Sequence, residues 1–307
     1  MSYYLGIDGG GTKTACAVGD DNRLLASVTA GPSNIVRVGE MQARESLQRV
    51  VGQACSAAGI RPEQVSATCV GGSGAARPEL AAIVHAILAG ILSSPIKVVG
   101  DMEIALEAAF EDGPGVMVIA GTGSIAYGRD DKGRTARAGG WGFEIGDEGS
   151  AHWIGRTAVG LVLRASDREA PGVATSALGQ ALCKAWGVSS LLDLARAANS
   201  VPSPDFAGLL RSVVACDDHL AREVLGAAGR ELAQIAAVVM QRLFVEDGEG
   251  LVRVATTGSV FRHASPVRDA FYNAVQGLAP RAQVMPQVVD PVEGALRMAR
   301  KITGHAV

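Results

Sequence analysis

The stretch with the clearest chemistry is Asp8–Thr14, in which a carboxylate, three consecutive glycines, two threonines and a lysine follow a short apolar run. Glycines at a sharp turn let backbone N–H groups approach phosphate oxygens. The spacing from Gly6 to Gly11 fits a Walker A loop, but Thr12 stands where that motif needs lysine. Residues 14–19 then alternate as in a second strand. We therefore expect a strand-turn-strand hairpin that holds nucleotide phosphates, and a plain glycine-rich turn is the structural alternative.

The opening pattern returns in the middle of the chain. One offset of 110 residues relates Gly11–Thr12 to Gly121–Thr122 and Asp20–Asp21 to Asp130–Asp131. This offset predicts two halves of similar β-β-β-α construction, each with a phosphate hairpin facing a shared cleft. The spacing G-x-G-x-x-A from residue 121 also matches a dinucleotide-binding fingerprint, which requires a helix at that point. The residues that follow are typical of a strand, so we reject that interpretation.

Periodicity and turn residues predict the other elements. Strands are expected at residues 24–29, 65–70, 96–99, 116–120, 251–256 and 283–285. Helices are expected at residues 41–58, 79–92, 101–110, about 149–163, 178–186, 191–198, 221–243, 266–275 and 291–302. The resulting α/β chain divides into domains at residues 1–115 and 116–290. The second domain contains a helical insertion at about 165–215, and a C-terminal helix at about 291–307 packs back on the first.

Length and composition indicate a globular protein, and its charge favours a small molecule over nucleic acid or a membrane surface as its partner. The chain has 307 residues, 48% of them hydrophobic, and its mean hydropathy is +0.22, which allows a large core. It has no run of about 18 apolar residues and no signal sequence at its start, so we expect no membrane segment and a cytoplasmic protein. A net charge of −3 gives no basic surface for nucleic acid or anionic lipid.

The cysteines and histidines do not form metal-binding patterns. The chain has five of each, with no C-x-x-C and no H-E-x-x-H. We expect buried thiols, no disulfide framework and no zinc site.

A loop at residues 139–150 has a composition that core packing does not need. It combines five glycines, two aromatic residues and three carboxylates within twelve positions. Glycines on both sides of Trp141 favour a close approach by a ligand.

Four segments together carry a resemblance to a known family: residues 6–14, 121–124, 140–150 and 257–260. They resemble the N-acetylglucosamine kinases of the BadF/BadG/BcrA/BcrD ATPase family, within the actin-like, hexokinase and heat-shock-70 superfamily. The first motif identifies only the superfamily, whereas G-G-W-G…G-D-E-G-S is more specific to amino-sugar kinases. The resemblance spans nearly the whole chain. It implies two actin-like (ribonuclease H-like) domains, each a mixed sheet with flanking helices, around a cleft for ATP and sugar.

The same resemblance implies transfer of the γ-phosphoryl group of ATP to the 6-hydroxyl of N-acetylglucosamine or glucosamine. We expect a homodimer, although the sequence does not fix the oligomeric state. Asp101 is then the base that accepts the hydroxyl proton, although an Asp at that point is ordinarily a helix N-cap. Asp8 holds Mg²⁺ through water. The residues assigned to ATP are Gly10, Gly11, Thr12, Lys13, Gly121, Thr122, Gly258, Ser259 and Gly294, the last near the adenine. The alternative for Lys13 is that its side chain points into solvent and does not contact phosphate.

The resemblance assigns five residues to the sugar: Asn34, Ser124, Gly140, Trp141 and Asp147. Trp141 could equally be a core residue, and Asp147 could cap the helix that follows it. The sequence does not decide whether the 2-amino group must be acetylated.

Two other functional classes are alternatives to a kinase. An iron–sulfur ATPase activator of a 2-hydroxyacyl-CoA dehydratase needs interface cysteines, and none of the five closely follows the Gly-Thr-Gly segment at residues 121–123. A sugar-responsive regulator that does not phosphorylate needs a DNA-binding module, for which the residues before the first strand leave no room. Zinc-bearing repressor-kinase relatives are disfavoured because the chain has no cysteine cluster.

Overall fold

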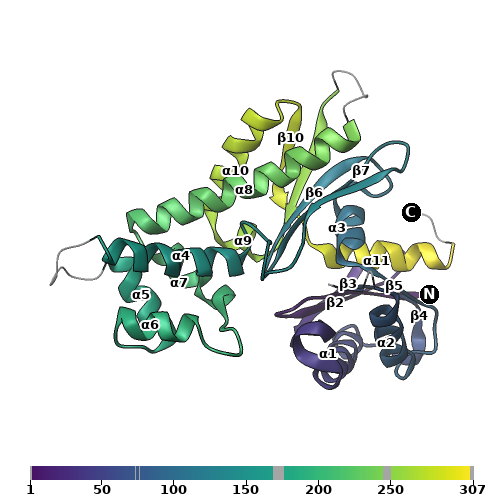
Figure 1. Ribbon diagram of the computed structural model, residues 1–307. Coiled ribbons are helices and arrows are strands. Elements are labelled where there is room, and N and C mark those ends of the chain that lie inside the picture. Colours follow the sequence, from purple (N-terminus) through teal and green to yellow (C-terminus); the bar gives the residue numbers. More distant parts are fainter. Residues whose placement is uncertain (1, 73, 76, 169–175, 245–249, 305–307) are drawn as a thin grey trace. The chain divides into compact units, whose positions relative to one another are not determined.

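The computed structural model describes residues 2–72, 74–75, 77–168, 176–244 and 250–304. The chain divides into two compact units, Met1–Gly113 with Val289–Val307 (unit 1) and Pro114–Val288 (unit 2). Each unit contains one five-stranded mixed sheet with flanking helices (Figure 1). The predicted α/β fold of two such domains is confirmed. Part of the expected insertion, residues 169–175, lies outside the described residues.

The two sheets share one topology. The strands of unit 1 are β1 (Tyr3–Gly9), β2 (Thr14–Gly19), β3 (Leu24–Ala30), β4 (Val65–Gly72) and β5 (Ile96–Gly100). Those of unit 2 are β6 (Gly115–Ala120), β7 (Ser124–Arg129), β8 (Thr135–Gly139), β9 (Val252–Thr257) and β10 (Ala282–Val288). The strand orders are β3-β2-β1-β4-β5 and β8-β7-β6-β9-β10. In each sheet the first three strands are antiparallel, and the later strands join in parallel.

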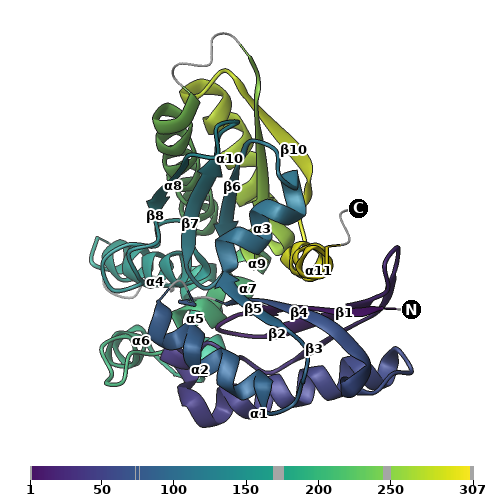
Figure 2. The same ribbon diagram turned by 90° about the vertical axis from the view of Figure 1, so that its right-hand side faces the viewer.

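In unit 1, helices cover both faces of the sheet. Helices α1 (Ile35–Ala57) and α2 (Pro78–Ala89) lie on one face, and α3 (Asp101–Phe110) and α11 (Pro291–Ile302) lie on the other (Figures 1 and 2). A short 3₁₀ helix, Pro62–Gln64, precedes β4. Because side chains alternate along a strand, Leu5 and Ile7 join the core beneath α1, whereas Tyr4 joins the core beneath α11.

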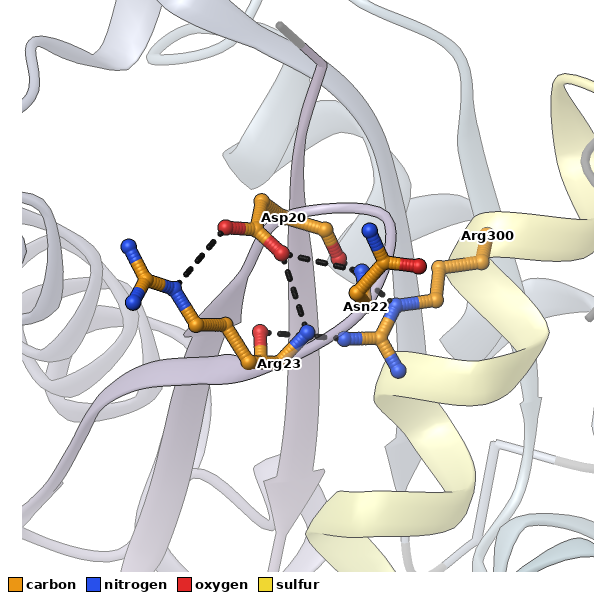
Figure 3. Close-up of polar contacts among 4 residues, drawn as sticks. All are labelled: Asp20, Asn22, Arg23 and Arg300. Atoms are coloured by element: carbon orange, nitrogen blue, oxygen red, sulfur yellow. Dashed lines mark hydrogen bonds and ion pairs between the residues drawn. The ribbon is translucent and has the colours of Figure 1, made fainter.

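The C-terminal helix α11 is fastened to the first hairpins of the chain. A Cβ on Gly6 would lie 2.3 Å from the backbone nitrogen of Leu296, so only glycine lets the helix approach β1 this closely. Arg300 donates from Nε to the carbonyl of Asp20 at 2.9 Å and from Nη2 to that of Arg23 at 3.2 Å (Figure 3). The carboxylate of Asp20 accepts the N–H groups of Asn22 and Arg23, both at 2.9 Å. The last helix thus stabilises the turn between β2 and β3.

In unit 2, one long helix spans the sheet. The helices are α4 (Ala151–Ser166), α5 (Ala177–Trp186), α6 (Leu191–Ala198), the 3₁₀ turn Phe206–Leu209, α7 (Leu210–Ala215), α8 (His219–Phe244), α9 (Ser259–His263) and α10 (Ser265–Leu278). Helix α8 packs on β6, β7 and β8, and α10 packs on α8 (Figure 1). A Cβ on Gly229 would lie 2.5 Å from the carbonyl oxygen of Val267, so this glycine allows the two helices to meet.

Two expectations about helices need correction. Helix α1 starts at Ile35, not at residue 41, because Asn34 caps an early turn that is separated from the rest by Gly39, with a φ of 78°. Periodicity alone did not reveal that turn. The short helices at residues 206–215 and 259–263 were also missed. None of the helices among the described residues is long and apolar enough to span a membrane.

Candidate active site

The first hairpin, Gly9–Thr14, joins β1 to β2 as the glycine pattern predicts. The N–H of Gly10 donates to the carbonyl of Lys13 at 3.0 Å, which closes the turn. Thr12 and Lys13 are exposed, whereas Gly10 and Gly11 are half-buried. Asp8 is half-buried near the end of β1, where it pairs with Gly71 of β4. Hydroxyl, ammonium and backbone groups are therefore presented together beside one carboxylate.

The segment that follows β3 supports this hairpin. The carbonyl of Gly10 accepts the N–H groups of Ser33 and Asn34 at 3.2 and 3.3 Å. Thr14 Oγ1 donates to Ser33 Oγ at 2.8 Å in a buried contact. A Cβ on Gly11 would lie 3.5 Å from Nη1 of Arg37. Sequence reasoning missed Ser33 and Arg37, and no pattern in the chain points to them, because β3 separates them from the hairpin.

Asn34 is fixed by the helix that it caps. Its Oδ1 accepts the N–H of Val36 at 3.0 Å and that of Arg37 at 3.4 Å. The oxygen therefore faces the helix, and the other end of the amide, Nδ2, is a donor directed away from these N–H groups.

Asp101 follows β5 as the first residue of α3. The N-cap of this helix is Gly100, and Oε1 of Glu103 accepts the Gly100 N–H at 3.1 Å. Asp101 is therefore not the N-cap that was its structural alternative. Its Oδ1 accepts the N–H of Met102 at 3.0 Å, and the residue is half-buried. Since β1, β4 and β5 are parallel neighbours, Asp8 and Asp101 lie at the same edge of the unit 1 sheet.

Unit 2 contains a matching hairpin between β6 and β7. The N–H of Gly121 donates to the carbonyl of Gly123 at 2.9 Å. The carbonyls of Gly121 and Thr122 accept the N–H groups of Ala151 and His152 at 2.9 and 3.3 Å, which anchors the hairpin on the first turn of α4. A Cβ on Gly121 would meet nothing within 4 Å, so packing does not explain this glycine.

Asp147 joins the 139–150 loop to that hairpin. Its backbone φ is 59°, its side chain is buried, and it accepts the N–H of Gly142 at 3.3 Å. Its Oδ2 would lie 2.5 Å from a Cβ on Gly123. Burial raises the pKa of this carboxyl above its ordinary value, while the N–H groups of Gly142 and Ser124 oppose the shift. Ser150 caps α4 by accepting the N–H of Trp153 at 3.1 Å, so helix capping does not account for Asp147.

The rest of this loop places an aromatic side chain in solvent. Gly140 has a φ of 68°, and a Cβ there would lie 2.6 Å from Ile125. Trp141 is 68% exposed and therefore not a core residue. The guanidinium carbon of Arg137 lies 4.8 Å from the Trp141 ring centroid. Ser124 is buried and donates from Oγ to the carbonyl of Glu148 at 2.7 Å.

Two predicted nucleotide glycines have packing roles of their own. A Cβ on Gly258 would lie 2.2 Å from the carbonyl oxygen of Ala120, and its φ is 105°. The next residue, Ser259, is exposed and begins α9. Gly294 is buried in α11, where a Cβ would lie 1.9 Å from the carbonyl oxygen of Ile104 in α3. This packing explains Gly294 without a ligand, and its place near adenine stays a prediction.

The described residues contain no group of three or more His, Cys, Asp or Glu side chains that could hold a metal ion. A single carboxylate, Asp8, beside a glycine hairpin fits Mg²⁺, which keeps several of its own waters. Burial raises the pKa of the Cys69 thiol to about 12 and holds that of Cys16 above its ordinary range, so both thiols are protonated at neutral pH.

The model of the BadF/BadG/BcrA/BcrD ATPase family matches residues 5–299. The chain belongs to this family. Among curated proteins, this family member is 33% identical to the N-acetylmuramic acid/N-acetylglucosamine kinase of Clostridium acetobutylicum, over 98% of this chain and 99% of that protein. It is 27% identical to the N-acetyl-D-glucosamine kinase of Dictyostelium discoideum, over 96% and 97%.

The chain is also similar to solved structures. A protein of Chromobacterium violaceum provisionally assigned as an N-acetylglucosamine kinase has a TM-score of 0.75 and 25% identity, over 96% of this chain and 98% of that one. The family predicted from the sequence motifs, BadF/BadG/BcrA/BcrD, is thus confirmed.

Proposed function

We propose that this protein is an ATP-dependent amino-sugar kinase that phosphorylates the 6-hydroxyl of N-acetylglucosamine or glucosamine. The observation that carries the proposal is the carboxylate of Asp101, which stands at the end of β5 while Glu103 performs the capping. The kinases to which the chain is similar over nearly its whole length give the substrate class. We further propose a cytoplasmic homodimer.

Phosphoryl transfer requires neutralised phosphate oxygens and an aligned acceptor. The first hairpin supplies backbone N–H groups, the Thr12 hydroxyl and the Lys13 ammonium for the β- and γ-phosphates, and Arg37 adds a second cation beside Gly11. Gly121 and Thr122 supply the corresponding groups of unit 2. Asp8 would hold Mg²⁺ through water, and Mg²⁺ when bound supplies positive charge to the phosphate oxygens.

Asp101 acts as the general base. It accepts the proton of the sugar 6-hydroxyl as that oxygen forms its bond to the γ-phosphorus, while the bond to the β-phosphate oxygen breaks and ADP leaves. Asp101 is half-buried, so its carboxylate is accessible to a substrate hydroxyl.

Each unit carries residues that we assign to the sugar. Asn34 offers Nδ2 as a donor, since its oxygen is used by the helix. Trp141 offers an exposed apolar ring, and Gly140, Ser124 and Asp147 offer polar groups from the same loop and hairpin. Neither the iron–sulfur activator nor the regulator is favoured by a specific feature of the site.

A coupled ADP-release assay tests the proposal, with N-acetylglucosamine, glucosamine and N-acetylmuramic acid as acceptors. We expect turnover with at least one of the first two, and an NMR spectrum of the product with the phosphate on carbon 6. A sample that binds ATP but phosphorylates none of the three sugars would contradict the kinase assignment. A phosphate on another carbon would contradict only the site of transfer.

A further inference from the structure

Ser33 holds the first hairpin on both sides of its turn. Its N–H donates to the carbonyl of Gly10 at 3.2 Å, and its Oγ accepts the hydroxyl of Thr14 at 2.8 Å. A Cβ on Gly9 would lie 2.8 Å from Ser33 Oγ, so the serine is packed against the end of β1 as well. Ser33 and Thr14 are both buried, and a hydrogen bond between buried hydroxyls is stronger than one exposed to water.

The carbonyl of Gly10 also holds the next residue of the chain. It accepts the N–H of Asn34 at 3.3 Å. Asn34 is one of the residues that we assign to the sugar, and its side-chain oxygen is engaged by the first turn of α1. The direction of the Gly10 carbonyl therefore helps to determine where Asn34 lies.

The same carbonyl belongs to the peptide group that presents the N–H of Gly11. A peptide group is planar, and in the trans form its C=O and N–H point in opposite directions. The two N–H groups that hold the Gly10 carbonyl therefore also fix the direction of the Gly11 N–H. This N–H is among the hairpin groups that we assign to phosphate. Under the proposed function, one peptide group thus has Asn34 at its C=O end and phosphate at its N–H end.

We infer that the peptide group between Gly10 and Gly11 is a positioning element shared by both substrates, and that Ser33 and Thr14 hold it in the orientation that phosphate and sugar both require. The inference rests on the proposed function. Ser33 is a positioning residue, because it acts through this peptide group and through Asn34.

A shared element links the affinities of the two substrates. The apparent Kd of a ligand rises when fewer molecules have the competent orientation, and a first ligand that restores this orientation removes the loss for the second. Loss of the hydrogen bond between Thr14 and Ser33 should therefore weaken both ligands by one common factor. Each ligand should then restore the affinity for the other.

The test is a calorimetric titration of the sugar and of a non-hydrolysable ATP analogue with Mg²⁺, each alone and each with the other at saturation. The sugar is N-acetylglucosamine or glucosamine, whichever has the higher kcat/KM. Ser33→Ala removes the acceptor of the buried Thr14 hydroxyl and should raise the Kd of each ligand alone by the same factor, about tenfold. With the analogue at saturation, the Kd of the sugar should return to within about twofold of that of the unmodified protein under the same condition.

Variants of the other partner guard against misfolding of the first. Thr14→Val removes the same hydrogen bond and should reproduce both effects, whereas Thr14→Ser keeps the hydroxyl and should keep each Kd within about twofold. Ser46→Ala is the matched control, because Ser46 is a buried serine of α1 that packs beside Gly31. It should leave both Kd values unchanged.

The outcomes separate this inference from the proposed function. A rise in the Kd of one ligand only, or a rise in both that the second ligand does not reverse, would overturn the shared element while the kinase assignment stands. Unchanged Kd values in both Ser33→Ala and Thr14→Val would overturn it as well. A sample that binds the analogue but neither binds nor phosphorylates a sugar would contradict the proposed function, and the inference with it.

Discussion

The carboxylate of Glu103 accepts the backbone N–H of Gly100 at 3.1 Å. Glu103 therefore caps helix α3, a role that the nearby Asp101 could otherwise have had. An acidic side chain at the start of a helix is stabilising because it satisfies an orphan N–H and complements the helix dipole. Glu103 performs the capping, so the cap of α3 does not require Asp101 in its first turn.

Asp101→Asn should therefore lower kcat by about 10²–10⁴-fold, because the amide accepts no proton, and leave nucleotide affinity and Tm nearly unchanged. Steady-state kinetics, calorimetric ATP binding and thermal unfolding measure the three quantities. Glu103→Ala is the matched control. It should lower the free energy of unfolding by about 1 kcal/mol and retain most turnover. If Asp101→Asn kept its kcat, the base would have to be another residue.

Local patterns were sufficient for much of the fold. The hairpin from β1 to β2 follows from glycines and alternation, and α3 and α11 have the predicted starts because Gly100 and Pro291 mark them in the sequence. The start of α1 was missed because Asn34 is held by a hydrogen bond to Gly10, a contact between distant parts of the chain.

The same limit applies to the site. The sequence does not distinguish a glycine that forms a turn, such as Gly10, from one that allows close packing. Gly294 is of the second kind, because a side chain there would collide with the backbone of α3. The exposed state of Trp141 and the buried state of Asp147 depend on where the 139–150 loop packs, which composition does not specify. Arg37 reaches Gly11 only after α1 has been positioned against the hairpin.

The carboxyl of Asp147 should make stability fall as the pH rises. Burial raises its pKa, so folding takes up a proton between the ordinary value near 4 and the higher pKa of the folded state. The stability that this group contributes is present at low pH and is lost as the pH rises through the folded pKa. Asp147→Asn removes the titration, so the Tm of the variant minus that of the unmodified protein should become more positive from pH 4 to pH 7.

Asp20→Asn is the control, because the pKa of Asp20 is shifted in the opposite direction to that of Asp147. The N–H groups of Asn22 and Arg23 lower the pKa of Asp20, so its contribution is present above the ordinary value and is lost as the pH falls. The corresponding Tm difference should become more negative from pH 4 to pH 7. Parallel pH profiles for the two variants would show that burial does not control the Asp147 titration.

Arg300 should be a major source of stability in unit 1. It is 9% exposed and donates to the carbonyls of Asp20 and Arg23, and Arg300→Met removes both hydrogen bonds, although the Arg23 carbonyl keeps the N–H of Asp20 at 3.1 Å. We expect a loss of about 2–3 kcal/mol in the free energy of unfolding, measured with urea and circular dichroism. Arg44→Met removes an exposed pair with Glu40 and should change it by less than about 0.5 kcal/mol. Equal effects would mean that α11 is not fastened through Arg300.

Gly121 and Gly258, both assigned to the proposed nucleotide site, differ in what a side chain would meet there. A methyl on Gly121 has open space around it, so Gly121→Ala should leave Tm unchanged and lower ATP affinity about tenfold by obstructing the approach of phosphate to the backbone. A methyl on Gly258 would lie 2.2 Å from the Ala120 carbonyl oxygen at a φ of 105°, so Gly258→Ala should lower the free energy of unfolding by about 1–3 kcal/mol. Thermal unfolding and ATP titration of both variants give the comparison. A drop in Tm for Gly121→Ala, with unchanged ATP affinity, would assign this glycine to packing and remove unit 2's hairpin from the phosphate site.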